Sequence, residues 1–496
     1  MNANGLIFTS LGWQTSLERS PGAYRIAHYL RQTMGIDVEV IDRLTAWSNK
    51  QLVQLIDSRI SQNQIKWIGL SITWLSRYET YKVIISFIRA KYPDLKILLG
   101  GQDIYYKDLD ADYFINGYGE LAVVEALNHA FSNGKIKGIP LNKGWVINAL
   151  HMYPAYPPET VGGSYSIEYQ DRDFILPSDV LTIELERGCK FKCKYCSYPI
   201  LGVKGDTSRT EEDMYRELQS NYDKWGVTNY AIADETINSN EEKLMKFSSA
   251  VKRLSFKPNF TGFVRLDLLY NNTRDRELLL ESRIWGQYYG VETFNHESGK
   301  LIGKGLHPDK NKQTALEMRE LFNKELGLYV STMSMITGLP RESYESLDNT
   351  VKWFKENWMD QHWVFFPLTI HKKISEQDGA IKLSAMGEDL TKYGYREIPA
   401  ELDMEDFKHN GAYPYSVNWE NEYGNKDKAV AWSSVNTGDQ QNAYLDSWDV
   451  WGVASYSGLD IQTIRNSAFT RQHADDLVYK IAPLENEYIK NKLALY

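Results

Sequence analysis

The chain has 496 residues, of which 43% are hydrophobic and 24% are charged, and its formal net charge is −9. At roughly 150 residues per domain, this length predicts about three domains, each with a substantial hydrophobic core. The acidic balance argues against a surface that coats nucleic acid, and the sequence has no apolar run of about 18 residues that would predict a membrane-spanning helix.

The first 135 residues alternate strand and helix signals. Short apolar runs suited to buried strands are followed by stretches with apolar residues at helical spacing. The expected strands are 5–10, 37–41, 67–72, 95–99 and 113–115, and the expected helices are 21–34, 52–60, 78–92 and 121–131. This repetition predicts an α/β fold with a doubly wound, Rossmann-like parallel sheet. Residues 136–180 are rich in proline and glycine, which predicts an irregular linker.

The only three cysteines of the chain, Cys189, Cys193 and Cys196, form a CxxxCxxC motif, and the aromatic Tyr195 precedes the last one. Iron–sulfur clusters usually take four protein ligands, so three thiolates would leave one iron open to another molecule. A structural zinc site would need a fourth ligand, and no histidine lies at zinc-finger spacing from the motif. Free thiols of this kind indicate a reducing compartment, and the N-terminus does not resemble a signal peptide, so we expect a cytoplasmic protein.

Residues 181–371 contain six further strand signals, with helical stretches between most of them. The expected strands are 181–186, 229–233, 260–266, 286–291, 329–336 and 362–369. This pattern predicts a partial (β/α)6 barrel that is open on one side, in which ligands bind at the carboxyl ends of the strands. Five candidate residues lie at or near those ends: Asp234, Glu235, Arg265, Glu292 and Gly338.

The cysteine spacing, the aromatic residue and the strand-end set together resemble the radical S-adenosylmethionine (SAM) superfamily. The resemblance implies a [4Fe–4S] cluster held by the three cysteines, with the open iron bound by the amino and carboxylate groups of SAM, which is then cleaved reductively. It also implies roles for single residues, while the catalytic residues stay unassigned. Tyr195 would lie beside the adenine, Asp234 or Glu235 would accept a hydrogen bond from the SAM amino group, Arg265 would pair with the SAM carboxylate, Glu292 would bind the ribose hydroxyls, and Gly338 would let the adenine approach the backbone.

The first domain resembles the cobalamin-binding domain that precedes many radical SAM cores. The matching pieces are Ser71 and Thr73 after the third strand, Gly100 and Gly101 after the fourth, and the segment 116–120 before the last helix. The loop 11–22 departs from that family because it lacks the DxHxxG motif whose histidine binds cobalt. Two interpretations therefore stay open: a domain that binds cobalamin without this ligand, and a degenerate domain that packs on the core or binds substrate.

The last segment, residues 372–496, has many turn signals and aromatic residues. Helices are expected over 441–445, 459–472 and 475–482. In the superfamily such an extension commonly covers the barrel mouth. Its tryptophans and tyrosines are suited to bind a planar or sugar-like substrate, or they belong to a core.

These features predict a radical SAM enzyme that functionalises an unactivated carbon of an organic substrate, with cobalamin-dependent methyl transfer as the first hypothesis. One alternative is radical hydrogen abstraction without cobalamin. Another is an electron-transfer or sensor protein that carries only the cluster, although such a protein would not need the strand-end residues of a SAM pocket. A protein reductant such as flavodoxin or ferredoxin is the expected partner.

Overall fold

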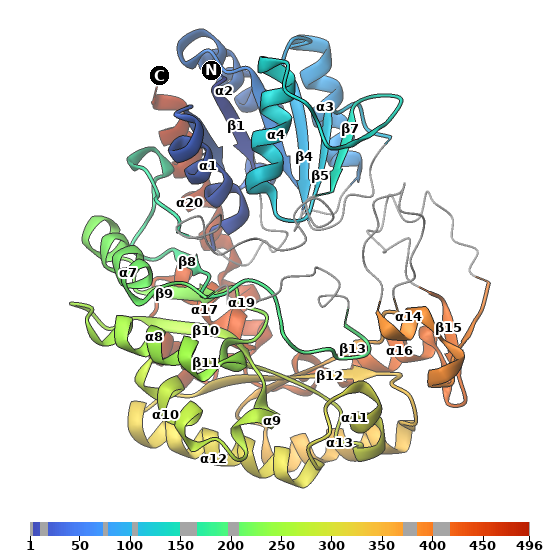
Figure 1. Cartoon of the computed structure of the whole chain (residues 1–496). Coiled ribbons are helices and arrows are strands. Elements are labelled where there is room, and N and C mark those ends of the chain that lie inside the picture. The colour runs from blue at the N-terminus through green and yellow to red at the C-terminus, as the bar shows by residue number, and fades with distance from the viewer. Residues whose placement is uncertain are drawn as a thin grey trace.

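The computed structural model describes residues 3–9, 18–72, 78–101, 108–148, 166–196, 208–370, 384–399 and 417–495. These residues form a seven-stranded sheet, a six-stranded sheet and a small three-stranded sheet. Figure 1 shows the first sheet at the top of the molecule and the second below it, with both chain termini at the top. The predicted α/β fold with two parallel sheets is confirmed. No helix among the described residues is long and apolar enough to cross a membrane.

The first sheet has the strand order β2-β1-β3-β4-β5-β7-β6, and every pair is parallel except β6 with β7. Its strands are β1 (Gly5–Phe8), β2 (Val38–Ile41), β3 (Trp67–Ser71), β4 (Lys96–Gly101), β5 (Tyr113–Asn116), β6 (Ile139–Pro140) and β7 (Trp145–Asn148). Its helices are α1 (Pro21–Met34), α2 (Asn49–Asn63), α3 (Tyr78–Lys91) and α4 (Gly119–Ser132). Alternate strand residues face opposite sides, so Ile7 packs with α1 and α4, whereas Leu6 and Phe8 pack with α2 and α3.

Two strands, β6 and β7, lie inside the stretch expected to be an irregular linker. Residues 145–148 pair with β5 and extend the sheet, and the last three of them are buried. Strand β7 is short and follows Pro140 and Gly144, which are turn signals, so the local pattern concealed it. Pro140 is tolerated because β6 lies at the sheet edge, where a missing N–H breaks no ladder.

The second sheet is fully parallel and follows the chain order from β8 to β13. Its strands are β8 (Val180–Ile183), β9 (Asn229–Ile232), β10 (Asn259–Val264), β11 (Gly286–Glu292), β12 (Val330–Thr337) and β13 (His362–Pro367). The helices between them are α7 (Glu211–Trp225), α8 (Glu241–Lys252), α9 (Leu266–Leu269), α10 (Thr273–Glu281), α11 (His296–Ile302), α12 (Pro308–Leu326) and α13 (Tyr344–Asn357). This is the six-unit βα arrangement that the sequence predicts.

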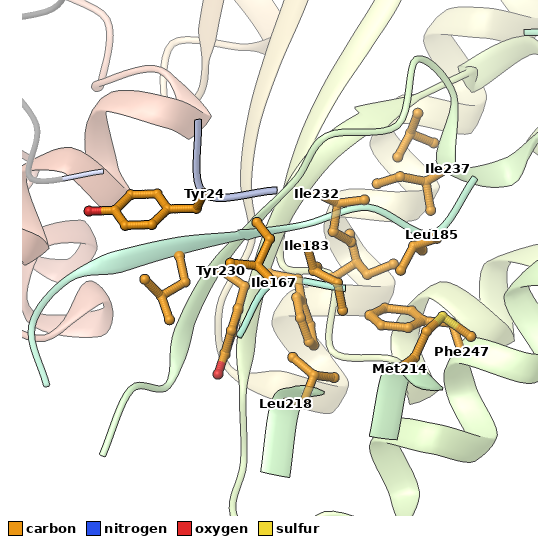
Figure 2. Packing of buried hydrophobic residues seen from close by; sticks show 14 of the residues in the cluster. Tyr24, Ile167, Ile183, Leu185, Met214, Leu218, Tyr230, Ile232, Ile237 and Phe247 are labelled. Carbon is orange, nitrogen blue, oxygen red and sulfur yellow. The ribbon is translucent and has the colours of Figure 1, made fainter. Parts of the chain in front are cut away.

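One hydrophobic core joins the two sheets. A continuous cluster of buried residues includes the α1–α4 side of the first sheet and the helix-covered side of the second. Figure 2 shows part of it, running from Tyr24 of α1 past Ile167 and Tyr230 to Met214 and Phe247. Because separating the sheets would expose this surface to water, the core fixes their relative position.

Arg19 adds a buried polar clamp between distant segments. Its guanidinium donates to Asp179 at 2.9 and 2.7 Å and to the carbonyl of Phe174 at 2.9 Å, and it lies 5.2 Å from the ring centre of Tyr488. Tyr488 belongs to the last helix, so the clamp connects the loop before α1, the segment before β8 and the C-terminus.

Helices of the C-terminal segment pack against both large sheets. Its helices are α14 (Ala385–Glu388), α16 (Lys426–Asn436), α17 (Ser447–Ser457), α18 (Ile461–Asn466), α19 (Arg471–Leu477) and α20 (Ile481–Ala494), and its strands are β14 (Arg396–Glu397), β15 (Trp419–Asn421) and β16 (Gly424–Asn425). Helix α17 contacts the side of the second sheet opposite its covering helices, since Ser447 bonds Thr332 and Thr261. Helix α20 packs beside α2, on the side of the first sheet that α2 and α3 cover.

The prediction of a helix over 441–445 is wrong. A short 3-10 turn occupies Gly438–Gln441, and the helix begins only at Ser447. Asp446 explains this start, because its carboxylate accepts hydrogen bonds from the N–H groups of Trp448 and Asp449. The helices expected over 459–472 and 475–482 are present as α18, α19 and the start of α20, with breaks between them.

Candidate functional site

The loop that carries the three cysteines follows the end of β8 and is tied down at several points. The Asp234 carboxylate accepts from the N–H groups of Leu185 at 2.7 Å and Glu186 at 3.2 Å. Further along, the N–H of Lys194 donates to the carbonyl of Ile302 at 3.0 Å. These bonds hold the loop at the carboxyl end of the sheet, where ligands bind in such folds.

The three cysteines are free thiols and partly buried. Burial raises the pKa of Cys193, while the positive charges of Lys304 and Arg265 act to lower it. No three His, Cys, Asp or Glu side chains in the described ranges converge on a single metal position. Three thiolates at this spacing are a donor set that fits a [4Fe–4S] cluster with one iron left open to another ligand.

Arg265 lies at the end of β10 and contacts the cysteine loop. Its guanidinium carbon is 4.0 Å from the ring centre of Phe191, a cation–π contact, and its Nε donates to Asp267 at 3.0 Å. The arginine predicted to bind a carboxylate is therefore beside the cluster loop. In this structure it is paired with a neighbouring aspartate.

Glu292 is the strand-end residue with the most distinctive surroundings. The hydroxyl of Tyr195 donates to its carboxylate at 2.6 Å, and Lys304 lies 3.7 Å away. Its φ is 72°, at a register shift between Gly290 and Glu292 in β11. A glutamate in this backbone region is strained, and such strain is found at functional sites more often than elsewhere. The structure thus brings the predicted residues Tyr195 and Glu292 into direct contact.

The two candidate acids after β9 differ in their surroundings. Asp234 is buried, and beside its bonds to the loop it accepts from Lys243 at 2.9 Å, so both of its oxygens are used. Glu235 is partly buried, and the next residue, Thr236, places its hydroxyl 3.9 Å from the sulfur of Cys189. Asp234 therefore supports the loop.

Gly338 follows β12 with a φ of 91°. A Cβ at this position would overlap the indole ring of Trp419, and the hydroxyl of Tyr395 donates to the Gly338 carbonyl at 2.6 Å. Packing by the C-terminal segment is thus sufficient to require a glycine here, independently of any ligand.

A cavity of about 160 Å³ lies at the carboxyl edge of the first sheet. Its lining includes three of the predicted residues, Ser71, Gly100 and Gly101, together with Tyr118 and Glu120. A Cβ on Gly100 would meet no atom within 4 Å, so the small residue leaves the cavity open. Thr73 and residues 10–17 of the loop without histidine lie outside the described residues. The glycine-lined cradle fits the tail of a large cofactor such as cobalamin.

Two buried ion pairs connect this cavity to the cysteine loop. Arg25 and Glu120 line the cavity, and they pair with Glu184 and Arg187, respectively, which precede Cys189. Arg25 lies 3.0 Å from Glu184, and the guanidinium of Arg187 lies over the ring of Tyr118 at 4.4 Å.

Sequence reasoning missed Phe191, Lys304 and Arg187 as parts of the site. Lys304 follows the turn at Gly303, whose φ is 89° and which faces Cys193, and that turn is the only local signal for it. Arg187 stands two residues before the first cysteine, a position from which its partner 67 residues away could not be inferred.

A family model described as the radical SAM superfamily matches residues 183–354. An uncharacterized methyltransferase, PH0819 of Pyrococcus horikoshii, is 22% identical over 340 residues, which cover 64% of this chain and 70% of that protein.

Solved structures share the fold over most of the chain. The radical SAM methyltransferase TsrM from Kitasatospora setae, with cobalamin and a [4Fe–4S] cluster bound, matches with a TM-score of 0.64 at 13% identity, covering 98% of this chain and 100% of that one. The cobalamin-dependent radical enzyme OxsB, with aqua-cobalamin and SAM bound, matches with a TM-score of 0.53 at 14% identity, covering 71% of this chain and 52% of that one. At these identities the likeness establishes the common architecture.

Proposed function

We propose, on the basis of the radical SAM family match over residues 183–354, that the chain is a cobalamin-dependent enzyme that transfers a methyl group to an unactivated carbon of an organic substrate. The observation that supports this best is the placement of two candidate cofactor sites at facing edges. The cavity lies at the carboxyl edge of the first sheet, and residues on its wall pair with residues that lead into the cysteine loop.

Each candidate cofactor has residues suited to hold it. Cys189, Cys193 and Cys196 would bind the cluster, and Gly100 and its neighbours on the cavity wall would accommodate part of the corrinoid. When bound, the cluster supplies an electron to SAM and the corrinoid carries the methyl group, and this chemistry belongs to the cofactors.

The strand-end residues would orient SAM. Glu292 is held by Tyr195 and Lys304 so that its carboxylate could accept hydrogen bonds from ribose hydroxyls. Arg265 would bind the carboxylate of SAM, exchanging its pairing with Asp267. Asp234 or Glu235 would accept a hydrogen bond from the SAM amino group, and Asp234 would have to share an oxygen that already holds the loop or Lys243.

An external electron donor completes the proposal. Lys190 and Lys192 are exposed beside the cysteine loop, where they would attract an acidic reductant such as a flavodoxin or ferredoxin. The substrate stays unassigned. One structure of the similar protein TsrM contains tryptophan as substrate, with a TM-score of 0.57 at 13% identity and coverage of 80% of this chain and 79% of that one.

The test is an anaerobic reconstitution with iron, sulfide and hydroxocobalamin, followed by SAM and dithionite. We expect bound corrinoid, and S-adenosylhomocysteine or 5′-deoxyadenosine as a slow product without substrate. Cys193→Ala should lose iron and both products but keep its circular dichroism spectrum. Cluster-loaded protein that forms 5′-deoxyadenosine but binds no corrinoid would instead indicate hydrogen abstraction without cobalamin. Loaded protein that forms neither product would favour an electron carrier.

A further inference from the structure

Four charged side chains lie buried where the cavity of the first sheet meets the loop of the second. Arg25 belongs to α1 and Glu120 to the first turn of α4, whereas Glu184 and Arg187 follow β8. Arg187 bonds Glu120 through one nitrogen and lies 3.2 Å from Glu184 through another, and Glu184 lies 3.0 Å from Arg25. The four side chains form one connected row with two arginines and two glutamates. The row begins at Arg25 on the cavity wall, passes through Glu184 and Arg187 after β8, and ends at Glu120 on the same wall.

The surrounding charges favour the ionised form of Glu120 despite its burial. Burial acts to raise the pKa of Glu120, but the charge and hydrogen bond of Arg187 together with the charge of Arg25 outweigh it and hold that pKa below its ordinary value.

The two cavity residues have unused bonding capacity. Glu120 is 4% exposed and Arg25 is 7% exposed. Among the described residues, Oε2 of Glu120 and Nε of Arg25 have no hydrogen-bond partner, although both side chains line the cavity. Buried polar atoms without partners are costly, so a ligand that satisfied them would bind with a specific gain. A carboxylate oxygen needs a donor and a guanidinium nitrogen needs an acceptor, and hydroxyl or primary amide groups provide both.

The inner pair of the chain leads directly to the cysteines. Arg187 stands two residues before Cys189, and between them Gly188 turns the backbone with a φ of 88°. The planar guanidinium of Arg187 contacts Glu120, Glu184 and the ring of Tyr118 at once. A movement of the N-terminal end of α4 would therefore shift the start of the cysteine loop.

We propose that Arg25, Glu184, Arg187 and Glu120 are positioning residues that couple a hydroxyl- or amide-bearing corrinoid in the cavity to the geometry of the cysteine loop. This inference rests on the proposed function. The ligand contacts Glu120 and Arg25, these fix Glu184 and Arg187, and the loop is then held in the arrangement that binds the cluster. Coupling of this kind is reciprocal and usually changes affinity by a factor of about 5 to 150.

The test measures iron release from the cluster-loaded protein in the presence of a ferrous chelator, with and without saturating hydroxocobalamin. In the unmodified protein, the corrinoid should slow iron release at least about fivefold. In Arg187→Lys, which keeps the charge but loses the planar fork, the corrinoid should no longer slow it. Glu120→Gln is a second variant that keeps the side-chain shape, and it should behave the same way if Arg187→Lys does not fold. Titration confirms that each variant is saturated with corrinoid.

Arg59→Lys is the matched control. Arg59 is a buried arginine paired with Glu39 at 2.7 Å on the opposite side of the first sheet, away from the cavity. This variant should keep the full effect of corrinoid on iron release. Equal iron release with and without bound corrinoid in the unmodified protein would overturn the coupling while leaving the proposed function intact. A slowing that persists in both Arg187→Lys and Glu120→Gln would also overturn it, because simple shielding of the cluster would then explain the effect. Absence of corrinoid binding to every form would instead overturn the proposed function itself.

Discussion

Gly100 offers a way to close the cavity without disturbing the fold. It is near the end of β4, its φ lies outside the region that only glycine tolerates, and a Cβ there would meet no atom within 4 Å. Gly100→Leu should therefore cost little stability, and replacing glycine at a compatible position often stabilises by about 0.4–1 kcal/mol. The added side chain extends into a cavity of only about 160 Å³. Binding of hydroxocobalamin should weaken at least tenfold, which corresponds to about 1.4 kcal/mol.

The matched control is Ile97→Val on the same strand. Ile97 is fully buried on the opposite side of the sheet, so losing one methyl group should cost about 0.5–1.5 kcal/mol of stability and leave corrinoid binding unchanged. Spectrophotometric titration and denaturant unfolding, run on both variants, separate the two effects. If Gly100→Leu is folded, retains its iron and still binds the corrinoid with unchanged affinity, the corrinoid does not occupy this cavity.

Two further predictions concern residues near the end of β12. Burial raises the pKa of Glu342 to about 8 against an ordinary value of 4.5, so the folded state binds the proton more tightly and stability falls as pH rises from about 5 to 8. Glu342→Gln keeps an acceptor for the Thr293 hydroxyl. The difference in unfolding free energy between variant and parent should therefore grow over this pH interval by up to several kcal/mol. A difference that stays constant with pH would contradict the raised pKa of Glu342. Gly338→Ala should lower the free energy of unfolding by about 2–4 kcal/mol, because the residue has a positive φ and the added Cβ overlaps Trp419. The second substitution Trp419→Leu should restore part of this stability. Full stability with weakened SAM binding would instead favour the interpretation that Gly338 makes room for the adenine.

The parts of the fold that local sequence signals determine could be predicted closely. Helix α1 has the expected bounds because Ser20 precedes it, Pro21 occupies its first position and Gly35 ends it in the left-handed region with a φ of 62°. Apart from β7, the parallel strands were found because buried strands are continuous apolar runs, and their bounds differ from expectation by a few residues at most.

Helix α17 shows why the C-terminal segment could not be predicted in the same way. Eight of its eleven residues are buried, so it has no polar side and no clear amphipathic period. Its capping aspartate, Asp446, was the usable signal. The site had a similar limit, because Asp234 and Glu235 are equivalent in sequence, and only the bonds of Asp234 to the loop backbone and to Lys243 show which acid supports the loop.

The meeting of the two candidate sites depends on contacts that no local pattern encodes. A general rule places ligands at the carboxyl edges of parallel sheets, and it predicts each site separately. It does not say that the edges face each other. That arrangement follows from the shared hydrophobic core, from the Arg19 clamp and from Lys492 of α20, which bonds Glu39 at 3.0 Å across 453 residues of sequence. These contacts are buried, so separating the two sheets would expose both apolar and charged side chains, and the contacts hold the cavity and the cysteine loop near each other. The Arg25–Glu184 and Arg187–Glu120 pairs can then act as a short, stiff connection between them.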